Sequence, residues 1–140
     1  MQVPLEKMAE FARSFCESLP PVRERAHVVG LVGDLGAGKT TFVQHVANEL
    51  GVVDPVLSPT YVFVQSHQTT HPVFTTLVHI DAYRLKPEEA RTIGWPKVAD
   101  DPHALVLVEW PERLGDEFPS TAPQIHFEVL SDTEREVSYA

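Results

Sequence analysis

The sequence has one cysteine, few basic residues and no long apolar segment, and each shortage excludes a class of protein. Because Cys16 is the single cysteine, a disulfide framework or a multi-cysteine metal site cannot form within one chain. The 11 Lys and Arg residues stand against 20 Asp and Glu residues, which gives a formal net charge of −9. Phosphate neutralisation needs clusters of Lys and Arg, so this balance argues against a surface that binds nucleic acid on its own.

The same shortages argue against a membrane or secreted protein. No apolar run approaches the length of a membrane span. The first fifteen residues, MQVPLEKMAEFARSF, lack the apolar region of a signal peptide and contain acids. We therefore expect a cytoplasmic protein without membrane association, and its 140 residues suit a single domain over residues 1–140.

The hydrophobic pattern predicts helices and strands that alternate in the first half of the chain and strands that cluster late. Expected helices cover Leu5 to Leu19, Thr40–Leu50 with Gly51 as its stop, and the short segment Pro87–Thr92. Expected strands cover His27–Val32, Tyr61–Gln65, Val73–Ile80 and Ala104–Val108, and Pro96–His103 is predicted as a loop. Gln124–Leu130 and Arg135–Tyr139 are typical of a hairpin. This order favours an α/β three-layer domain with a mixed, partly parallel central sheet.

A phosphate-binding loop follows the first of these strands. Residues 33–40, GDLGAGKT, match G-x-x-x-x-G-K-[ST] in full, which average composition would produce by chance in well under ~1% of chains this long. Glycines let several backbone N–H groups face inward and bind phosphates. Lys39 is expected to reach the β- and γ-phosphates and Thr40 to place its hydroxyl on Mg²⁺. The candidate nucleotide-binding residues of this segment are Gly33, Gly36, Ala37, Gly38, Lys39, Thr40 and Thr41.

Two acids at strand ends are candidates for the metal. P-loop proteins place a second carboxylate at the end of a neighbouring strand, near the cation. Glu109 ends the strongest apolar strand, LVLV, and Asp81 ends the β-branched strand before it. Either acid can hold Mg²⁺ while the other orients the attacking water, and a solvated acid at a strand end is the alternative for both.

The phosphate-binding loop makes the predicted α/β fold P-loop NTPase-like, and two classes of P-loop protein fit the sequence less well than an ATPase. A GTPase needs an N-K-x-D guanine reader, yet the single asparagine, Asn48, lies inside the predicted loop helix. A small-molecule kinase usually carries an arginine-bearing lid, and the region between Thr92 and Ala104 is short and has no arginine. A kinase is therefore disfavoured without being excluded.

Four motifs stand in register along most of the chain. They are GDLGAGKTTF from Gly33, SPTY at Ser58–Tyr61, HIDAYRL at His79–Leu85 and VEWPERL at Val108–Leu114. In order and spacing they resemble the TsaE family, also called YjeE, the bacterial ATPase of the tRNA threonylcarbamoyladenosine pathway. The resemblance runs from the first helix to the final hairpin.

The resemblance implies roles for particular residues. Thr60, in the Ser-Pro-Thr stretch, would belong to a switch loop beside the γ-phosphate, and a rigid proline turn is the alternative. Asp81 would be functionally essential, and Glu109 would be the Mg²⁺ ligand together with Thr40. Arg135 matches a basic hairpin residue that contacts nucleotide, with a solvated hairpin arginine as the alternative. Trp110 would cover the nucleotide, contact a partner or pack in the core.

The resemblance also implies a function. The expected protein is a Mg²⁺-dependent ATPase that binds ATP and ADP, with Lys39, Thr60, Asp81 and Glu109 as catalytic residues. It would act on the TsaD–TsaB complex, which modifies ANN-decoding tRNAs, and it would meet tRNA only through that complex. A P-loop small-molecule kinase and a nucleotide-gated binding module without turnover are the alternatives. The spacings of His67, His71 and His79 fit no zinc pattern, so we expect structural or surface roles for them.

Overall fold

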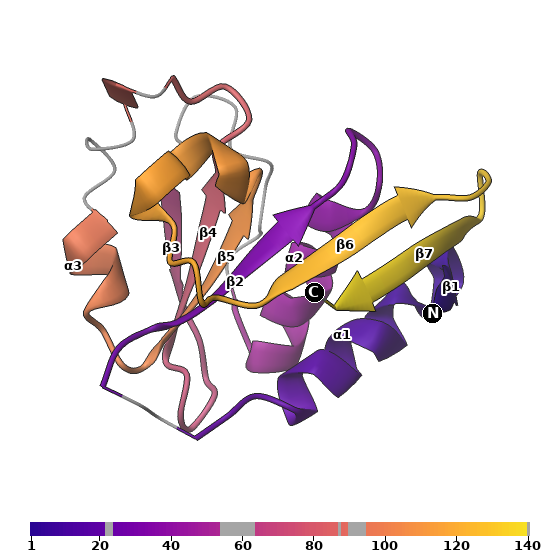
Figure 1. The fold of residues 1–140 in the computed structure, drawn as a ribbon. Coiled ribbons are helices and arrows are strands. Elements are labelled where there is room, and N and C mark those ends of the chain that lie inside the picture. The colour runs from indigo at the N-terminus through magenta and orange to yellow at the C-terminus, as the bar shows by residue number, and fades with distance from the viewer. Residues whose placement is uncertain (22–23, 54–63, 87, 90–94, 140) are drawn as a thin grey trace.

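The computed structural model describes residues 1–21, 24–53, 64–86, 88–89 and 95–139 (Figure 1). The strands are β1 (Gln2–Pro4), β2 (His27–Val32), β3 (Val64–Gln68), β4 (Thr76–Asp81), β5 (Ala104–Glu109), β6 (Gln124–Val129) and β7 (Glu134–Tyr139). The α-helices are α1 (Met8–Glu17), α2 (Lys39–Leu50) and α3 (Trp95–Ala99), with 3-10 turns η1 (Leu5–Lys7) and η3 (Pro111–Glu117). Within these ranges, no helix has the length and apolarity needed to cross a bilayer.

The strands form one mixed sheet in the order β1-β7-β6-β2-β5-β4-β3. Strand β2 pairs in parallel with both β5 and β6, and β5 pairs in parallel with β4. The outer pairs β1–β7, β6–β7 and β3–β4 are antiparallel. The predicted mixed, partly parallel sheet is therefore confirmed, and the carboxyl ends of β2, β5 and β4 meet at one edge.

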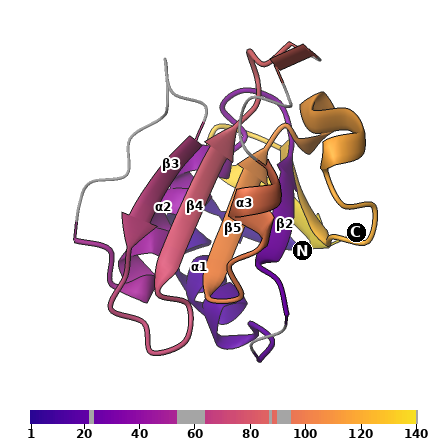
Figure 2. The ribbon, with the colours of Figure 1, turned by 90° about the vertical axis from the view of Figure 1, so that its left-hand side faces the viewer.

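Helices cover both faces of this sheet, as Figure 2 shows, with α3 in front of β5 and α1 and α2 behind the strands. Every residue of β5 is buried, and its side chains alternate between two apolar clusters. Leu105 and Leu107 pack with α1 and α2, whereas Val106 and Val108 pack with α3 and η3. Burial on both faces explains why this strand is a continuous apolar run.

The helix-side core centres on Phe42 of α2, which is fully buried. Its ring lies 5.6 Å from Phe11, 5.3 Å from Phe15 and 5.6 Å from Phe127 between centroids. These rings join α1, α2 and β6, and such aromatic pairs add to the burial of apolar area. They fix the start of α2 against the sheet.

Several predicted elements differ from the structure. Trp95–Ala99 forms α3 where Pro96–His103 was predicted as a loop, because proline is tolerated in a first helical turn and the Trp95 side chain is buried. The strand predicted from Val73 starts later, at Thr76, since the His71 ring accepts the Val73 and Phe74 N–H groups in a turn. Residues 61–63 of one predicted strand and most of the predicted helix Pro87–Thr92 lie outside the described residues.

Candidate nucleotide and metal site

The glycine-rich loop connects β2 to the first turn of α2. A Cβ on Gly33 would lie 2.5 Å from the Phe127 carbonyl oxygen of β6, so the loop passes too close to that strand for any side chain. Gly38 precedes α2 with φ 106°, and its carbonyl accepts the Phe42 N–H at 2.8 Å. The loop therefore turns sharply and presents the N-terminus of α2, whose partial positive charge suits phosphate groups.

A cleft of about 420 Å³ lies against this loop. Its lining comes from the loop, the start of α2, the ends of β4 and β5, the N-terminal segment and the final hairpin. The lining residues are Leu5, Leu35, Gly36, Gly38, Lys39, Thr40, Thr41, Asp81, Glu109, Trp110 and Arg135. Of the predicted site residues that the structure describes, most therefore line one cleft, whereas Gly33 and the buried Ala37 do not line it.

Lys39 is the first residue of α2, and the residue is 4% exposed. Its ammonium group donates to the Gly33 carbonyl and lies 3.7 Å from the centroid of the Trp110 ring. Burial lowers the pKa of this ammonium group, and the nearby carboxylates of Glu109 and Asp81 oppose the shift. The lysine is thus held at the cleft as a partly desolvated cation.

Thr40 and Glu109 meet across the floor of the cleft. The Thr40 hydroxyl lies 3.0 Å from each carboxylate oxygen of Glu109. Glu109 is 3% exposed and pairs in register with Leu31 of β2, the strand that leads into the loop. The two residues predicted to share a metal are therefore in direct contact, and Glu109 is not a solvated strand-end acid.

Asp81 lies beside Glu109 on the neighbouring strand, because β4 and β5 pair these two residues in register. Its carboxylate accepts the Tyr83 N–H at 3.1 Å. Burial raises the pKa of the Asp81 carboxyl group, the Tyr83 hydrogen bond opposes the shift, and the charge of Glu109 adds to it. The Thr40 contact singles out Glu109 as the better placed partner for a cation beside the helix.

Arg135 reaches the loop from β7, and the residue is buried, with 8% of its surface exposed. Its guanidinium donates to the carbonyls of Ser131 at 2.7 Å and Glu134 at 3.0 Å, and to the Gly36 carbonyl of the phosphate loop at 3.2 Å. The alternative of a solvated hairpin arginine is therefore wrong.

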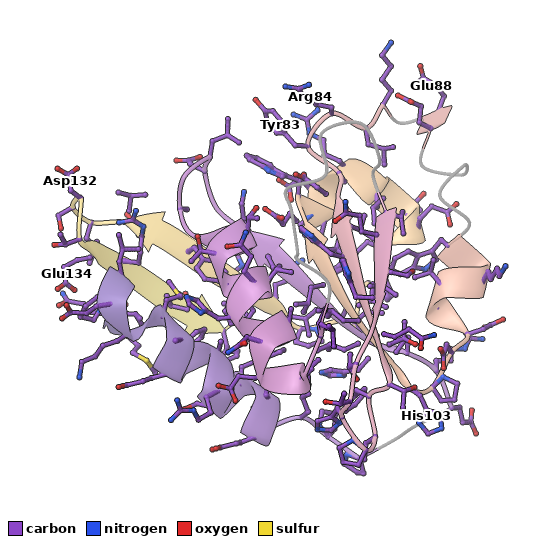
Figure 3. The ribbon with its side chains drawn as sticks, turned by 180° about the vertical axis from the view of Figure 1, so that it is seen from behind. Tyr83, Arg84, Glu88, His103, Asp132 and Glu134 are labelled. Atoms are coloured by element: carbon purple, nitrogen blue, oxygen red, sulfur yellow. The ribbon has the colours of Figure 1, made fainter. Side chains whose placement is uncertain are left out.

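Trp110 follows Glu109 in an unusual conformation. With φ 59°, it is the one non-glycine residue in the described ranges that has a positive φ. Its N–H donates to the Leu31 carbonyl at 3.2 Å, and its ring lies 5.0 Å from the Tyr83 ring. The turn directs the indole over Lys39. Figure 3 places Tyr83 and its neighbour Arg84 at this end of the sheet, opposite His103.

His79 contacts the cleft residue Glu109, and sequence reasoning did not predict this contact. It is fully buried, and its Nε2 atom lies 2.5 Å from Glu109 Oε2. A structural or surface role was expected for it, and the surface alternative is wrong. The available signal was the period of two along β4, which places His79 on the same face as Asp81.

Thr60 and the rest of the Ser58–Tyr61 motif lie outside the described residues. In the part of the chain that the structure covers, no group of three or more His, Cys, Asp or Glu side chains could hold a metal ion. The side-chain oxygens that line the cleft instead belong to the hydroxyls of Thr40 and Thr41 and to the carboxylates of Asp81 and Glu109.

The sequence matches a known family over nearly its whole length. The family model described as "Threonylcarbamoyl adenosine biosynthesis protein TsaE" covers residues 4–137. The chain belongs to the TsaE family. Among TsaE proteins, that of Rickettsia bellii is 33% identical over 132 residues, which is 93% of this chain and 85% of that protein. The TsaE protein of Treponema pallidum is 36% identical over 118 residues, 84% of each chain.

A solved structure supports the TsaE assignment. The crystal structure of YdiB from Bacillus subtilis superposes with a TM-score of 0.71 at 25% identity, covering 99% of this chain and 84% of that one. The TsaE protein of Bacillus subtilis is 33% identical over 112 residues, 80% of this chain and 68% of that protein. Fold and sequence therefore point to the same family of threonylcarbamoyladenosine biosynthesis proteins.

Proposed function

We propose that this TsaE-family chain binds ATP with Mg²⁺ and hydrolyses it in the service of tRNA threonylcarbamoylation. The observation that carries the proposal is the contact of Thr40 with Glu109, 3.0 Å from hydroxyl to carboxylate, beside the buried Lys39 ammonium group. This arrangement places a hydroxyl, a carboxylate and a cation at one helix N-terminus. The same set of groups recurs in phosphoryl-transfer sites.

The lining of the cleft suits a chain of phosphates. Loop glycines at 36 and 38 have φ 80° and 106°, which turns the backbone around the start of α2. Lys39 faces the same cleft. Arg135 lines it too, and its buried Nε atom has no hydrogen-bond partner among the described residues. The positive charge of this guanidinium at the cleft suits an anionic ligand such as a phosphate.

The oxygen donors suit Mg²⁺. This cation prefers oxygen ligands and is usually held by one or two carboxylates together with substrate phosphates rather than by a full protein cage. We assign Thr40 and Glu109 as the residues that hold it. When bound, Mg²⁺ supplies charge neutralisation on the phosphate oxygens.

The remaining residues position and stabilise. Lys39 contributes a cation for the β- and γ-phosphates from a partly desolvated position, where its charge is worth more than in water. Asp81 is the second carboxylate at the cleft, and we assign it to orient the attacking water. Thr60 is the proposed sensor of the terminal phosphate. In this account, positioning and electrostatics supply the catalysis.

The proposed partner of this cytoplasmic activity is the TsaD–TsaB complex. Hydrolysis resets that complex between turnovers, and the complex itself modifies the adenosine beside the anticodon of ANN-decoding tRNAs. The net charge of −9 is compatible with this division of labour, because the chain then has no need to hold tRNA itself.

Titration and phosphate-release assays test the proposal. Calorimetry with ATP or ADP and Mg²⁺ should show binding to the wild-type protein and loss of tight binding in Lys39→Ala. Phosphate release should rise when TsaD–TsaB is added. Acceptor phosphorylation would instead identify a kinase, binding without turnover in the presence of partners would identify a gate, and absence of any nucleotide association would overturn the proposal.

A further inference from the structure

We propose that His79 is a positioning residue that fixes the Glu109 carboxylate for the divalent cation. This inference rests on the proposed nucleotide and Mg²⁺ site and adds a residue to it. It starts from the 2.5 Å contact between His79 Nε2 and Glu109 Oε2, which joins a fully buried imidazole to a carboxylate that lines the cleft.

The sheet brings the two residues together diagonally. His79 is paired in register with Leu107, and Glu109 is paired with Asp81. The imidazole therefore reaches one step along β5 to the next side chain on the same face, a distance that a long side chain can span. Asp81 occupies the place directly opposite Glu109. His79 thus supports the carboxylate from within the core, while Asp81 lies beside it at the cleft.

One arrangement of hydrogens satisfies this geometry. We assign the hydrogen of the imidazole to Nε2, which then donates to Glu109 Oε2. His79 Nδ1 is buried and has no partner among the residues that the structure describes. With the hydrogen on Nε2, Nδ1 carries a lone pair. The His79 ring then has no buried N–H donor that lacks an acceptor.

The contact has a consequence for the other carboxylate oxygen. Oε2 is held by the His79 donor and by Thr40, so the carboxylate plane is fixed on its core side. Oε1 is left to the Thr40 hydroxyl and to the cleft that Glu109 lines. Hydrogen-bond partners of metal-binding carboxylates orient them in this way, and their loss typically weakens metal affinity by 10- to 100-fold.

A simpler role would be structural, with Glu109 serving merely to satisfy a core histidine. The two roles predict different variants. His79→Leu keeps an apolar volume and removes the donor, whereas His79→Gln keeps an N–H donor of similar reach. A structural role alters thermal stability without altering the Mg²⁺ dependence of nucleotide binding.

The test is a titration of fluorescent ADP at increasing Mg²⁺ concentrations. We expect the Mg²⁺ midpoint to rise about 10- to 100-fold in His79→Leu and to return within about threefold of wild type in His79→Gln. Nucleotide binding in EDTA should stay unchanged in both. His103→Gln, an exposed histidine at the opposite end of the sheet, is the matched control (Figure 3). A wild-type midpoint in His79→Leu overturns the inference.

A double-mutant comparison localises the effect. In a Glu109→Gln background, His79→Leu should add less than about twofold, because the carboxylate to be positioned is gone. Independent, multiplying effects would overturn the inference. If wild type itself shows no Mg²⁺-dependent binding, the proposed function fails instead, so the two failures are distinguishable.

A second measurement uses the wild-type protein without nucleotide, so its outcome does not depend on whether the variants fold. Long-range ¹H–¹⁵N correlation spectra of histidine-labelled protein should show His79 with its hydrogen on Nε2. A spectrum with the hydrogen on Nδ1 alone would leave Glu109 without this donor and would contradict the inference.

Discussion

Thr40 and Glu109 are 69 positions apart in the chain, yet the threonine hydroxyl lies 3.0 Å from both carboxylate oxygens. The contact explains why a core strand ends on an acid. Strand β5 lies between β2 and β4, so its carboxyl end opens onto the cleft beside the first turn of α2. Its apolar residues bury the strand on both faces, and the strand thereby places Glu109, which is 3% exposed, at the edge of the cleft.

The first prediction concerns the charge of Glu109. Glu109→Gln keeps the side-chain length and an acceptor for Thr40 while removing the negative charge. We expect Mg²⁺-dependent phosphate release to fall about 100-fold or more, the scale at which single electrostatic groups act in active sites. Nucleotide binding without Mg²⁺ should persist. Steady-state phosphate-release assays over a range of Mg²⁺ concentrations measure the effect, and an unchanged rate would remove Glu109 from the metal site.

The second prediction concerns Asp81 and pH. Burial raises the pKa of its carboxyl group above the usual 3.8, so the folded protein holds that proton more tightly than the unfolded chain does. Stability contributed by the protonated form is therefore lost as pH rises from about 3.8 through the folded pKa. Asp81→Asn keeps an acceptor for the Tyr83 N–H and should raise the Tm at pH 7. The difference in Tm between this variant and wild type should become smaller as the pH is lowered.

Thermal melts between pH 4 and pH 8 without nucleotide check this prediction. Asp101→Asn is a suitable control, because that exposed acid also accepts a backbone N–H, from His103 at 2.9 Å. A Tm for Asp81→Asn below that of wild type at pH 7 would show that the ionised carboxylate stabilises the fold. In that case, burial of the ionised Asp81 carboxylate would not destabilise the folded protein.

The fold was largely predictable wherever local pattern decides it. Strand β2, helix α2 and the β6–β7 hairpin follow from apolar periodicity and turn residues, and their bounds agree closely with the prediction. Strand β1 was missed because its 3 residues carry no pattern of their own and form by pairing with β7, at the far end of the chain. Helix α3 was missed because Pro96 suggested a loop, although burial of Trp95 decides the outcome.

The site was predictable in its composition and not in its contacts. The loop motif and the two strand-end acids are local signals. The contact of His79 with Glu109 depends instead on which strands are neighbours and in which register, and no short stretch of sequence contains that information. Arg135 likewise reaches Gly36 across 99 positions of sequence, through the pairing of the hairpin with β2.

The third prediction uses the two tryptophans as reporters. The centroid of the Trp110 ring lies 3.7 Å from the Lys39 ammonium group. A phosphate ligand that draws the lysine away therefore changes the surroundings of the indole. Trp95 lines a different cavity, beside β2 and α3. Titration with Mg²⁺ and ADP should change the intrinsic fluorescence of wild type and Trp95→Phe but not of Trp110→Phe. A signal retained by Trp110→Phe would place the indole away from the ligand.

The fourth prediction concerns Arg135, which joins the final hairpin to the phosphate loop. Its guanidinium donates to three backbone carbonyls, Ser131 and Glu134 in the hairpin and Gly36 in the loop. Arg135→Ala should lower the free energy of unfolding by about 1.5–3 kcal/mol, the range for hydrogen bonds to a charged group. It should also weaken nucleotide binding about tenfold. Arg135→Lys should do the same, because an ammonium group cannot hydrogen-bond to the loop and the hairpin at once, as the planar guanidinium does.

Denaturant titrations and calorimetry measure the two effects, with the exposed Arg84→Ala as control (Figure 3). If Arg135→Lys bound nucleotide as tightly as wild type, positive charge alone would be sufficient, and the link through Gly36 would have no part in shaping the loop.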